Sequence, residues 1–145
     1  QGDNQLKRSL KIKREDAIEL TKGKYTCLLK YNAPFAAECY GIMNMYCYKP
    51  KAIVQYNRKA YIAKENKIRI TFDSNIIATE TNMNIFDENL NLYPVFEKDK
   101  VVLEVKYNGF LLSYIKDSLE KVKHLETSVS KYCLSRHIGL NDLFM

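Results

Sequence analysis

The stretch VQYNRKAYIAKENKIRITFD, residues 54–73, predicts an antiparallel β-hairpin. Residues 54–63 and 67–73 are rich in β-branched and aromatic side chains, and a polar Lys-Glu-Asn turn separates them. Because successive side chains of a strand point to opposite faces, the second arm has an apolar face and a charged face. The apolar face holds Ile68, Ile70 and Phe72, and the charged face holds Lys67, Arg69, Thr71 and Asp73.

The first arm adds a second arginine to this pattern. Tyr56, Arg58 and Ala60 share one of its faces. If Arg58 and Arg69 face the same side of the sheet, two guanidinium groups lie on one surface. Planar guanidinium groups bind phosphate through paired hydrogen bonds, so such a surface suits a phosphate ligand.

The composition of the whole chain is that of a basic globular protein. It has 145 residues, 46% hydrophobic and 28% charged, with a net charge of +6 and a pI near 9.0. That charge favours an anionic partner such as nucleic acid, a phosphate polymer or a nucleotide, although a basic surface can also serve solubility alone. No apolar run approaches the roughly 20 residues that a membrane span needs. We expect a cytoplasmic chain, or one at the cytoplasmic face of a membrane in the full-length protein.

The cysteines do not predict a metal site. Cys27, Cys39, Cys47 and Cys133 show no Cys-x-x-Cys spacing, so a zinc site is not expected. Reduced, buried thiols in a cytosolic protein are the simpler interpretation.

The remaining sequence predicts further strands and helices around the hairpin. Alternation predicts strands over residues 5–13 and 100–107, and a continuation of the second hairpin arm through Ile76, Ile77 and Ala78 after a bulge or bend at Ser74-Asn75. Helical spacing and end signals predict helices over residues 16–21, 34–46, 110–123 and 128–136, and residues 82–98 are expected to form a long loop. We therefore expect an α+β fold in a single domain, residues 1–145.

The polar faces of the four predicted strands have two interpretations. They carry Lys7, Lys11, Arg58, Arg69, Glu104 and Lys106. An antiparallel sheet commonly leaves one polar face to water, and alternation alone favours that interpretation. The presence of arginines beside a single carboxylate favours a ligand-binding face instead. Four strands also leave two open edges, so the sheet would need closure or covering.

Five motifs, taken in chain order, resemble a known family. LKRSLKI, VQYNRKAY, KIRITFD, VVLEVKY and SVSKY are similar to the VTC (vacuolar transporter chaperone) domain of polyphosphate polymerases, within the triphosphate tunnel metalloenzyme, or CYTH-like, superfamily. The resemblance covers about residues 7–132. It implies an antiparallel tunnel-like barrel with a polar, phosphate-binding interior flanked by helices. It also implies ATP and inorganic polyphosphate as partners and Mn²⁺ or Mg²⁺ as the metal.

The resemblance implies roles for individual residues. Lys7, Arg58 and Arg69 match catalytic, phosphate-contacting positions, and Glu104 matches the glutamate that holds the metal. The other expected phosphate-binding residues are Lys11, Tyr56, Lys106, Ser130 and Lys131. The residues alone leave two alternatives open: the arginines could pair with Asp73 or Glu104, and Glu104 could pair with an arginine across strands.

Two departures from the family pattern affect the expected function. The N-terminal half of the family domain, with its Arg-x-Arg strand and a further lysine, has no counterpart here, and Ser128 stands where the family often has lysine. We therefore expect the C-terminal half of a VTC domain, with an open edge that another chain could complete. The resemblance implies a polyphosphate polymerase-type phosphotransferase, with a non-catalytic polyphosphate- or triphosphate-binding module and a basic nucleic-acid-binding domain as alternatives. Nucleic acid is the less favoured partner, since the tyrosines fall on core faces or in loops.

Overall fold

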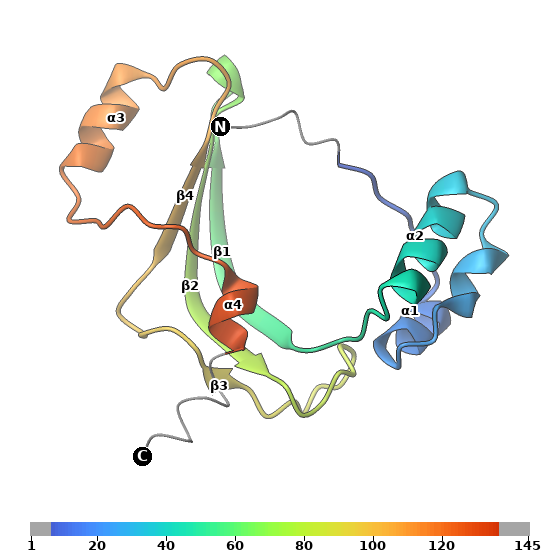
Figure 1. Ribbon diagram of the computed structural model, residues 1–145. Coiled ribbons are helices and arrows are strands. Elements are labelled where there is room, and N and C mark those ends of the chain that lie inside the picture. The colour runs from blue at the N-terminus through green and yellow to red at the C-terminus, as the bar shows by residue number, and fades with distance from the viewer. Residues whose placement is uncertain (1–6, 137–145) are drawn as a thin grey trace. The chain divides into compact units, whose positions relative to one another are not determined.

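The computed structural model describes residues 7–136, and the chain divides into two compact units (Figure 1). The first, called here the helical unit, comprises residues 7–51 and 81–89. The second, the sheet unit, comprises residues 52–80 and 90–136. Helices and antiparallel strands together make an α+β fold, as the sequence predicts.

The helical unit contains the two helices that the sequence predicts in this region. Helix α1 spans Arg14–Thr21, and helix α2 spans Pro34–Met45 with its proline in the first turn, where no backbone N–H is needed. Gly23 follows α1 with φ of 76°, a left-handed conformation that glycine adopts without strain. Both helices therefore begin and end close to the expected residues.

The core of the helical unit forms around a short helix that the sequence did not predict. The 3₁₀ helix η1 spans Tyr25–Lys30, and it buries Tyr25, Cys27 and Leu28. Partly buried side chains pack around these three: Leu10, Ile12, Leu20, Cys39, Tyr40 and Met43. Of the four cysteines, only Cys27 is buried; Cys47 and Cys133 are exposed, so the expectation of buried thiols is wrong for them.

The predicted strand over residues 5–13 is not found where it can be checked. Residues 7–13 form neither strand nor helix, and residues 5 and 6 lie outside the described part. The alternating apolar residues Leu10 and Ile12 are nevertheless partly buried, since they pack against the core of the helical unit. A strand also needs a neighbour to accept its backbone hydrogen bonds, and none of the described strands pairs with this segment. Arg8 instead donates both Nη groups to Glu38 on α2, at 2.6 and 2.5 Å.

The sheet unit is built on the predicted hairpin. Strand β1, Ile53–Ile62, pairs antiparallel with β2, Arg69–Thr79, and the short helix η2, Glu65–Lys67, forms the turn. Strand β4, Val102–Lys106, pairs with the first half of β2. Strand β3, Tyr93–Pro94, pairs with the second half and interrupts the predicted loop.

A β-bulge in β2 lies next to the position that the sequence predicts. Asn57 lies opposite Ser74 and Gln55 lies opposite Ile77, so Asn75 and Ile76 together face a single residue of β1. Asn75 takes a left-handed φ of 51°. The extra residue changes which side chains of β2 share a face. Asp73 lies on the same face as Ala78, whereas strict alternation would give it Ile77.

Helices α3, Ser113–Glu120, and α4, Lys131–Ser135, are shorter than predicted. Helix α4 begins late because the Ser130 hydroxyl accepts a hydrogen bond from the Cys133 backbone N–H, 3.3 Å away, which makes Ser130 the N-cap. Helix α4 packs against β1 and β2 (Figure 1). At its C-terminal end, Arg136 pairs with Glu80, just beyond β2.

The sheet is open rather than closed into a barrel. Strand β2 is central, with β1 on one side and both β3 and β4 on the other, and β1 pairs with no second strand among those described. The predicted burial holds for only part of each face of this segment. On the polar face Thr71 and Asp73 are buried while Arg69 is exposed, and Asp73 contacts Lys131 of α4. On the apolar face Ile68 is buried, Ile70 is half-buried and Phe72 is 37% exposed.

Candidate functional site

The strand register places four of the predicted site residues on one face of the sheet. Arg58 lies opposite Asp73 on β2, Glu104 opposite Thr71, and Lys106 opposite Arg69. Directly opposed residues of an antiparallel pair share a face, and residues 69, 71 and 73 alternate along β2. We call this surface the charged face, defined by Arg58, Arg69, Thr71, Asp73, Glu104 and Lys106.

Asp73 lies at the centre of a three-residue ion cluster on the charged face. Its side chain is 1% exposed. Arg58 donates Nε to Oδ1 and Nη2 to Oδ2, each at 2.6 Å, and Lys131 Nζ lies 2.6 Å from Oδ2. Lys131 is the first residue of α4, so this carboxylate joins the hairpin to the C-terminal helix. The open alternative for Arg58, a pair with Asp73, is therefore what the structure contains.

These cations change the acidity of the buried carboxyl. Hydrogen bonds from Arg58 and, to a smaller extent, from Lys131 together lower the pKa of Asp73 from its ordinary 3.8 to about 2, against the opposing effect of burial. Asp73 is therefore anionic at neutral pH, and the same hydrogen bonds raise the pKa of Arg58.

This pKa difference predicts an acid-dependent loss of stability. Because the folded pKa lies below the unfolded value, the unfolded chain binds the proton first as the pH falls. The contribution of Asp73, about 2 kcal/mol, is complete above about pH 4 and disappears as the pH falls towards about 2. The free energy of unfolding of Asp73→Asn should therefore decrease less between pH 5 and pH 2.5 than that of the wild type. Parallel decreases in the two proteins would contradict the assignment.

Tyr56 lies beside both cations of this cluster. The guanidinium carbon of Arg58 is 5.0 Å from the centroid of the Tyr56 ring, and Lys131 Nζ is 4.9 Å from the same centroid. Cations are attracted to the negative face of an aromatic ring, so the ring favours the positions that Asp73 also selects. The structure thus brings together three predicted residues: Tyr56, Arg58 and Lys131.

Glu104 occupies a more open position on the same face. Lys106 Nζ lies 2.9 Å from Oε1, and the Thr71 hydroxyl donates to Oε2 at 3.5 Å. The hydrogen bond from Lys106 lowers the pKa of Glu104, which is therefore ionised at neutral pH. Its side chain is 45% exposed. An accessible carboxylate of this kind fits a hard cation such as Mg²⁺ or Mn²⁺, which often takes most of its ligands from water and phosphate.

The other predicted residues have different surroundings. Arg69 is exposed and makes no ion pair within residues 7–136. Ser130 serves as the N-cap of α4. Lys7 and Lys11 are exposed residues of the helical unit and do not belong to the ion cluster.

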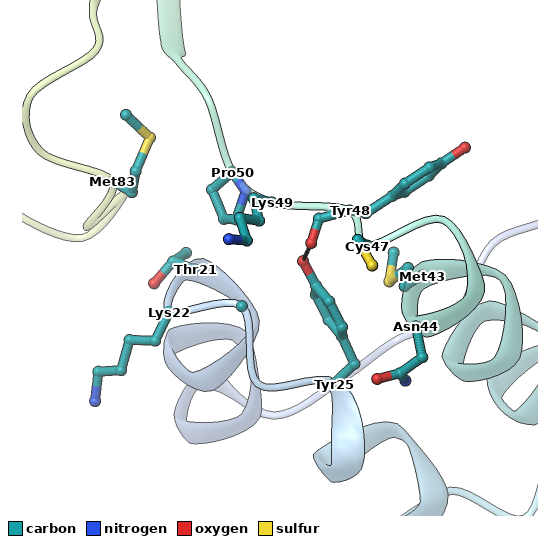
Figure 2. A pocket seen from close by; sticks show the side chains of 11 residues that line it. Thr21, Lys22, Tyr25, Met43, Asn44, Cys47, Tyr48, Lys49, Pro50 and Met83 are labelled. Atoms are coloured by element: carbon teal, nitrogen blue, oxygen red, sulfur yellow. Dashed lines mark hydrogen bonds between the residues drawn. The ribbon is translucent and has the colours of Figure 1, made fainter.

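The helical unit contains a pocket of about 550 Å³, none of whose lining residues was predicted to bind a ligand (Figure 2). It is lined by Thr21, Lys22, Gly23, Tyr25, Met43, Asn44, Cys47, Tyr48, Lys49, Pro50 and Met83. The Tyr25 hydroxyl crosses it to donate to the Tyr48 carbonyl, the dashed contact in Figure 2. The pocket therefore contains a structural hydrogen bond and offers no cluster of acidic or metal-binding groups.

Comparison with known proteins now places the chain. A family model described as the VTC domain matches residues 1–138. The chain belongs to the VTC domain family. This membership confirms the resemblance drawn from the motifs, and it implies a polyphosphate-related function at the level of the family. No curated protein and no solved structure matches the chain.

Sequence reasoning overlooked one site residue of this VTC domain. The sequence-based prediction named Asp73 only as a possible partner for an arginine. In the structure Asp73 joins Arg58 to Lys131. Its position four residues after Arg69 places both on one face, which was the available signal. The contact with Lys131 could not be predicted from the sequence, since it depends on where α4 packs.

None of the helices in the described part is long and apolar enough to cross a membrane.

Proposed function

We propose that this VTC domain supplies part of the site of a polyphosphate polymerase, which transfers the terminal phosphate of ATP to a polyphosphate chain with a divalent metal. The observation that supports the proposal most directly is the charged face, where Arg58, Arg69, Glu104 and Lys106 lie together in register. Lys131 reaches the same face from α4. A phosphate chain carries a regularly repeated negative charge, which a row of fixed cations complements.

Each cation has a different part in this proposal. Arg69 offers its whole guanidinium fork to a phosphate group, since no carboxylate of residues 7–136 pairs with it. Arg58 and Lys131 keep further N–H groups beyond those that Asp73 accepts. Phosphoryl transfer depends mainly on in-line positioning and on neutralising charge, so side chains that hold phosphates in place are the principal catalytic groups.

Glu104 is the residue that would hold the metal. It is anionic, half-exposed and on the charged face. When bound, a divalent cation neutralises charge on the phosphates that are being transferred. In the structure Lys106 pairs with Glu104. A cation bound to Glu104 would release Lys106 to contact phosphate.

The same proposal accounts for the open sheet. The charged face would form one wall of a tunnel-like barrel, and the free edge of β1 would pair with strands of the N-terminal half of a VTC domain or of another chain. Lys7 and Lys11, which belong to the helical unit, remain predicted phosphate-binding residues. In this proposal the chain corresponds to the C-terminal half of the family domain.

A second function, polyphosphate or triphosphate binding without turnover, is favoured by a specific observation. Two donors of Arg58 are occupied by Asp73, and Glu104 is paired with Lys106. Such a face can attract a polyanion without performing phosphoryl transfer.

One pair of measurements separates the two functions. Phosphate release and polymer formation are followed with ATP and Mn²⁺, and tripolyphosphate binding is measured by calorimetry. Binding together with turnover supports the polymerase. Binding without turnover supports the binding module, and the absence of both would overturn each proposal.

Glu104→Gln is expected to weaken the response to metal specifically. The amide keeps the shape of the side chain and removes the charge that holds the cation, so the half-saturating Mn²⁺ concentration should rise about 10-fold or more, with partial recovery at high metal. A metal titration of turnover, or of tripolyphosphate binding, measures this. Glu126→Gln makes the same charge change at an exposed position of the sheet unit and serves as the control. Equal half-saturating concentrations in wild type and Glu104→Gln would show that Glu104 is not a ligand.

A further inference from the structure

We propose that Asp73 is a positioning residue that holds Arg58 and Lys131 in one fixed arrangement, so that their remaining N–H groups face the phosphate chain together. This inference rests on the proposed function, because it assigns a role within the same site. The Asp73 carboxylate lies beside the proposed phosphate site, where its negative charge alone would oppose the binding of an anion.

The geometry shows that Asp73 acts through its neighbours rather than on a ligand. Its side chain is 1% exposed, and both carboxylate oxygens accept hydrogen bonds at 2.6 Å. The two cations are more accessible, at 33% for Arg58 and 22% for Lys131. A ligand can therefore reach the cations while the carboxylate behind them stays covered.

The ion cluster joins three separate elements of the sheet unit through non-covalent contacts. Arg58 is on β1, Asp73 on β2 and Lys131 at the start of α4. Two cations this close repel each other, and the shared carboxylate offsets that repulsion. The Tyr56 ring, about 5 Å from each cation, limits the positions that they can adopt.

Two simpler roles predict different behaviour. If Asp73 were only a negative charge near an anion site, its removal would strengthen the binding of every polyanion. If it were only a structural residue, its removal would weaken all binding together with stability. A positioning role predicts a selective effect, because fixed donors matter most for a short ligand of defined spacing.

The test compares two anions with the full chain. Tripolyphosphate is the short, regular ligand, and heparin is a polyanion with a different spacing of charges. For Asp73→Asn we expect the affinity for tripolyphosphate to fall about 10-fold while the affinity for heparin stays equal or rises. Asp117→Asn, at an exposed position of α3, makes the same charge change away from the cluster and should alter neither affinity. An unchanged or higher affinity of Asp73→Asn for tripolyphosphate would overturn the inference, as would an equal loss for both ligands.

A double-mutant cycle tests whether the effect passes through Lys131. The loss caused by Asp73→Asn should be clearly smaller in the Lys131→Gln background than in the wild type, because one of the positioned groups is then absent. Purely additive losses would overturn the inference. If Asp73→Asn is unfolded at the assay temperature, Asp73→Glu replaces it in both tests, since it moves the carboxylate by one methylene and keeps the charge. Failure of the proposed function is seen separately, as an absence of tripolyphosphate binding and turnover in the wild type.

Discussion

Arg58→Ala is expected to lower both the thermal stability of the chain and its affinity for tripolyphosphate. The substitution leaves the buried Asp73 carboxylate with Lys131 as its remaining ionic partner. Removing one partner from a buried ion pair is strongly destabilising, so the melting temperature should fall by roughly 5–10 °C. It would also remove the charge-assisted hydrogen bonds to phosphate that the proposed function assigns to Arg58, which should weaken tripolyphosphate binding about 30-fold and lower kcat about 10²–10³-fold. Thermal unfolding, calorimetry and the ATP assay measure the three effects.

The matched variants of this experiment are Arg58→Lys and Lys59→Ala. Lysine keeps the charge at position 58 but cannot present the planar fork that Asp73 accepts, so it should restore only part of each property. Lys59 lies opposite Phe72, on the other face of the sheet, and its loss should affect neither property appreciably. Full restoration by lysine would mean that charge alone, rather than geometry, explains the role of Arg58.

Arg69→Ala is expected to lower the affinity for tripolyphosphate and kcat about as much as Arg58→Ala does, with almost no change in thermal stability. Arg69 is exposed on the charged face and forms no ion pair within the described residues, so its loss leaves no buried charge unpaired. The melting temperature should change by no more than about 2 °C. The affinity for tripolyphosphate should fall about 10- to 100-fold, and kcat about 10²–10³-fold.

The decisive test compares the melting temperature and the tripolyphosphate affinity of Arg58→Ala with those of Arg69→Ala. Lys59→Ala again serves as the control for the loss of one positive charge from the sheet. If Arg69→Ala binds tripolyphosphate as tightly as the wild type, the charged face is not the phosphate site. If it melts as early as Arg58→Ala, the side chain has a structural partner that its exposure does not suggest.

The hairpin and its register were predictable because the evidence for them is local. Alternation in residues 67–73 and the polar turn before it are sufficient to define the two arms. A bulge or bend was predicted at Ser74-Asn75, and the structure has a bulge one residue later, at Asn75 and Ile76. The same parity predicts that Lys7, Arg58, Arg69 and Glu104 share a face; the register confirms this for the last three, whereas Lys7 lies in no strand. Helix α2 was equally clear, since Pro34 marks its first turn.

The errors arise where the outcome depends on distant parts of the chain. Alternation over residues 5–13 identifies the residues that become buried, but it cannot say whether a strand or a helix will bury them, and Leu10 and Ile12 pack on helices. The second ionic partner of Asp73 depends on where α4 packs, since the first turn of that helix brings Lys131 to Asp73. The central role of Asp73 follows from that packing and is not visible in its own neighbourhood.

The ion cluster also has a consequence for the order in which the chain folds. Arg58 and Asp73 are 15 residues apart and meet as soon as the hairpin closes, whereas the Arg136–Glu80 pair that fixes α4 spans 56 residues. Closing the longer loop costs more chain entropy, so we expect the hairpin to form first and α4 to dock afterwards. An early folding species would then carry Arg58 already paired but Lys131 still free. The complete arrangement of cations would be a late product of folding, formed only when the last described helix reaches the sheet.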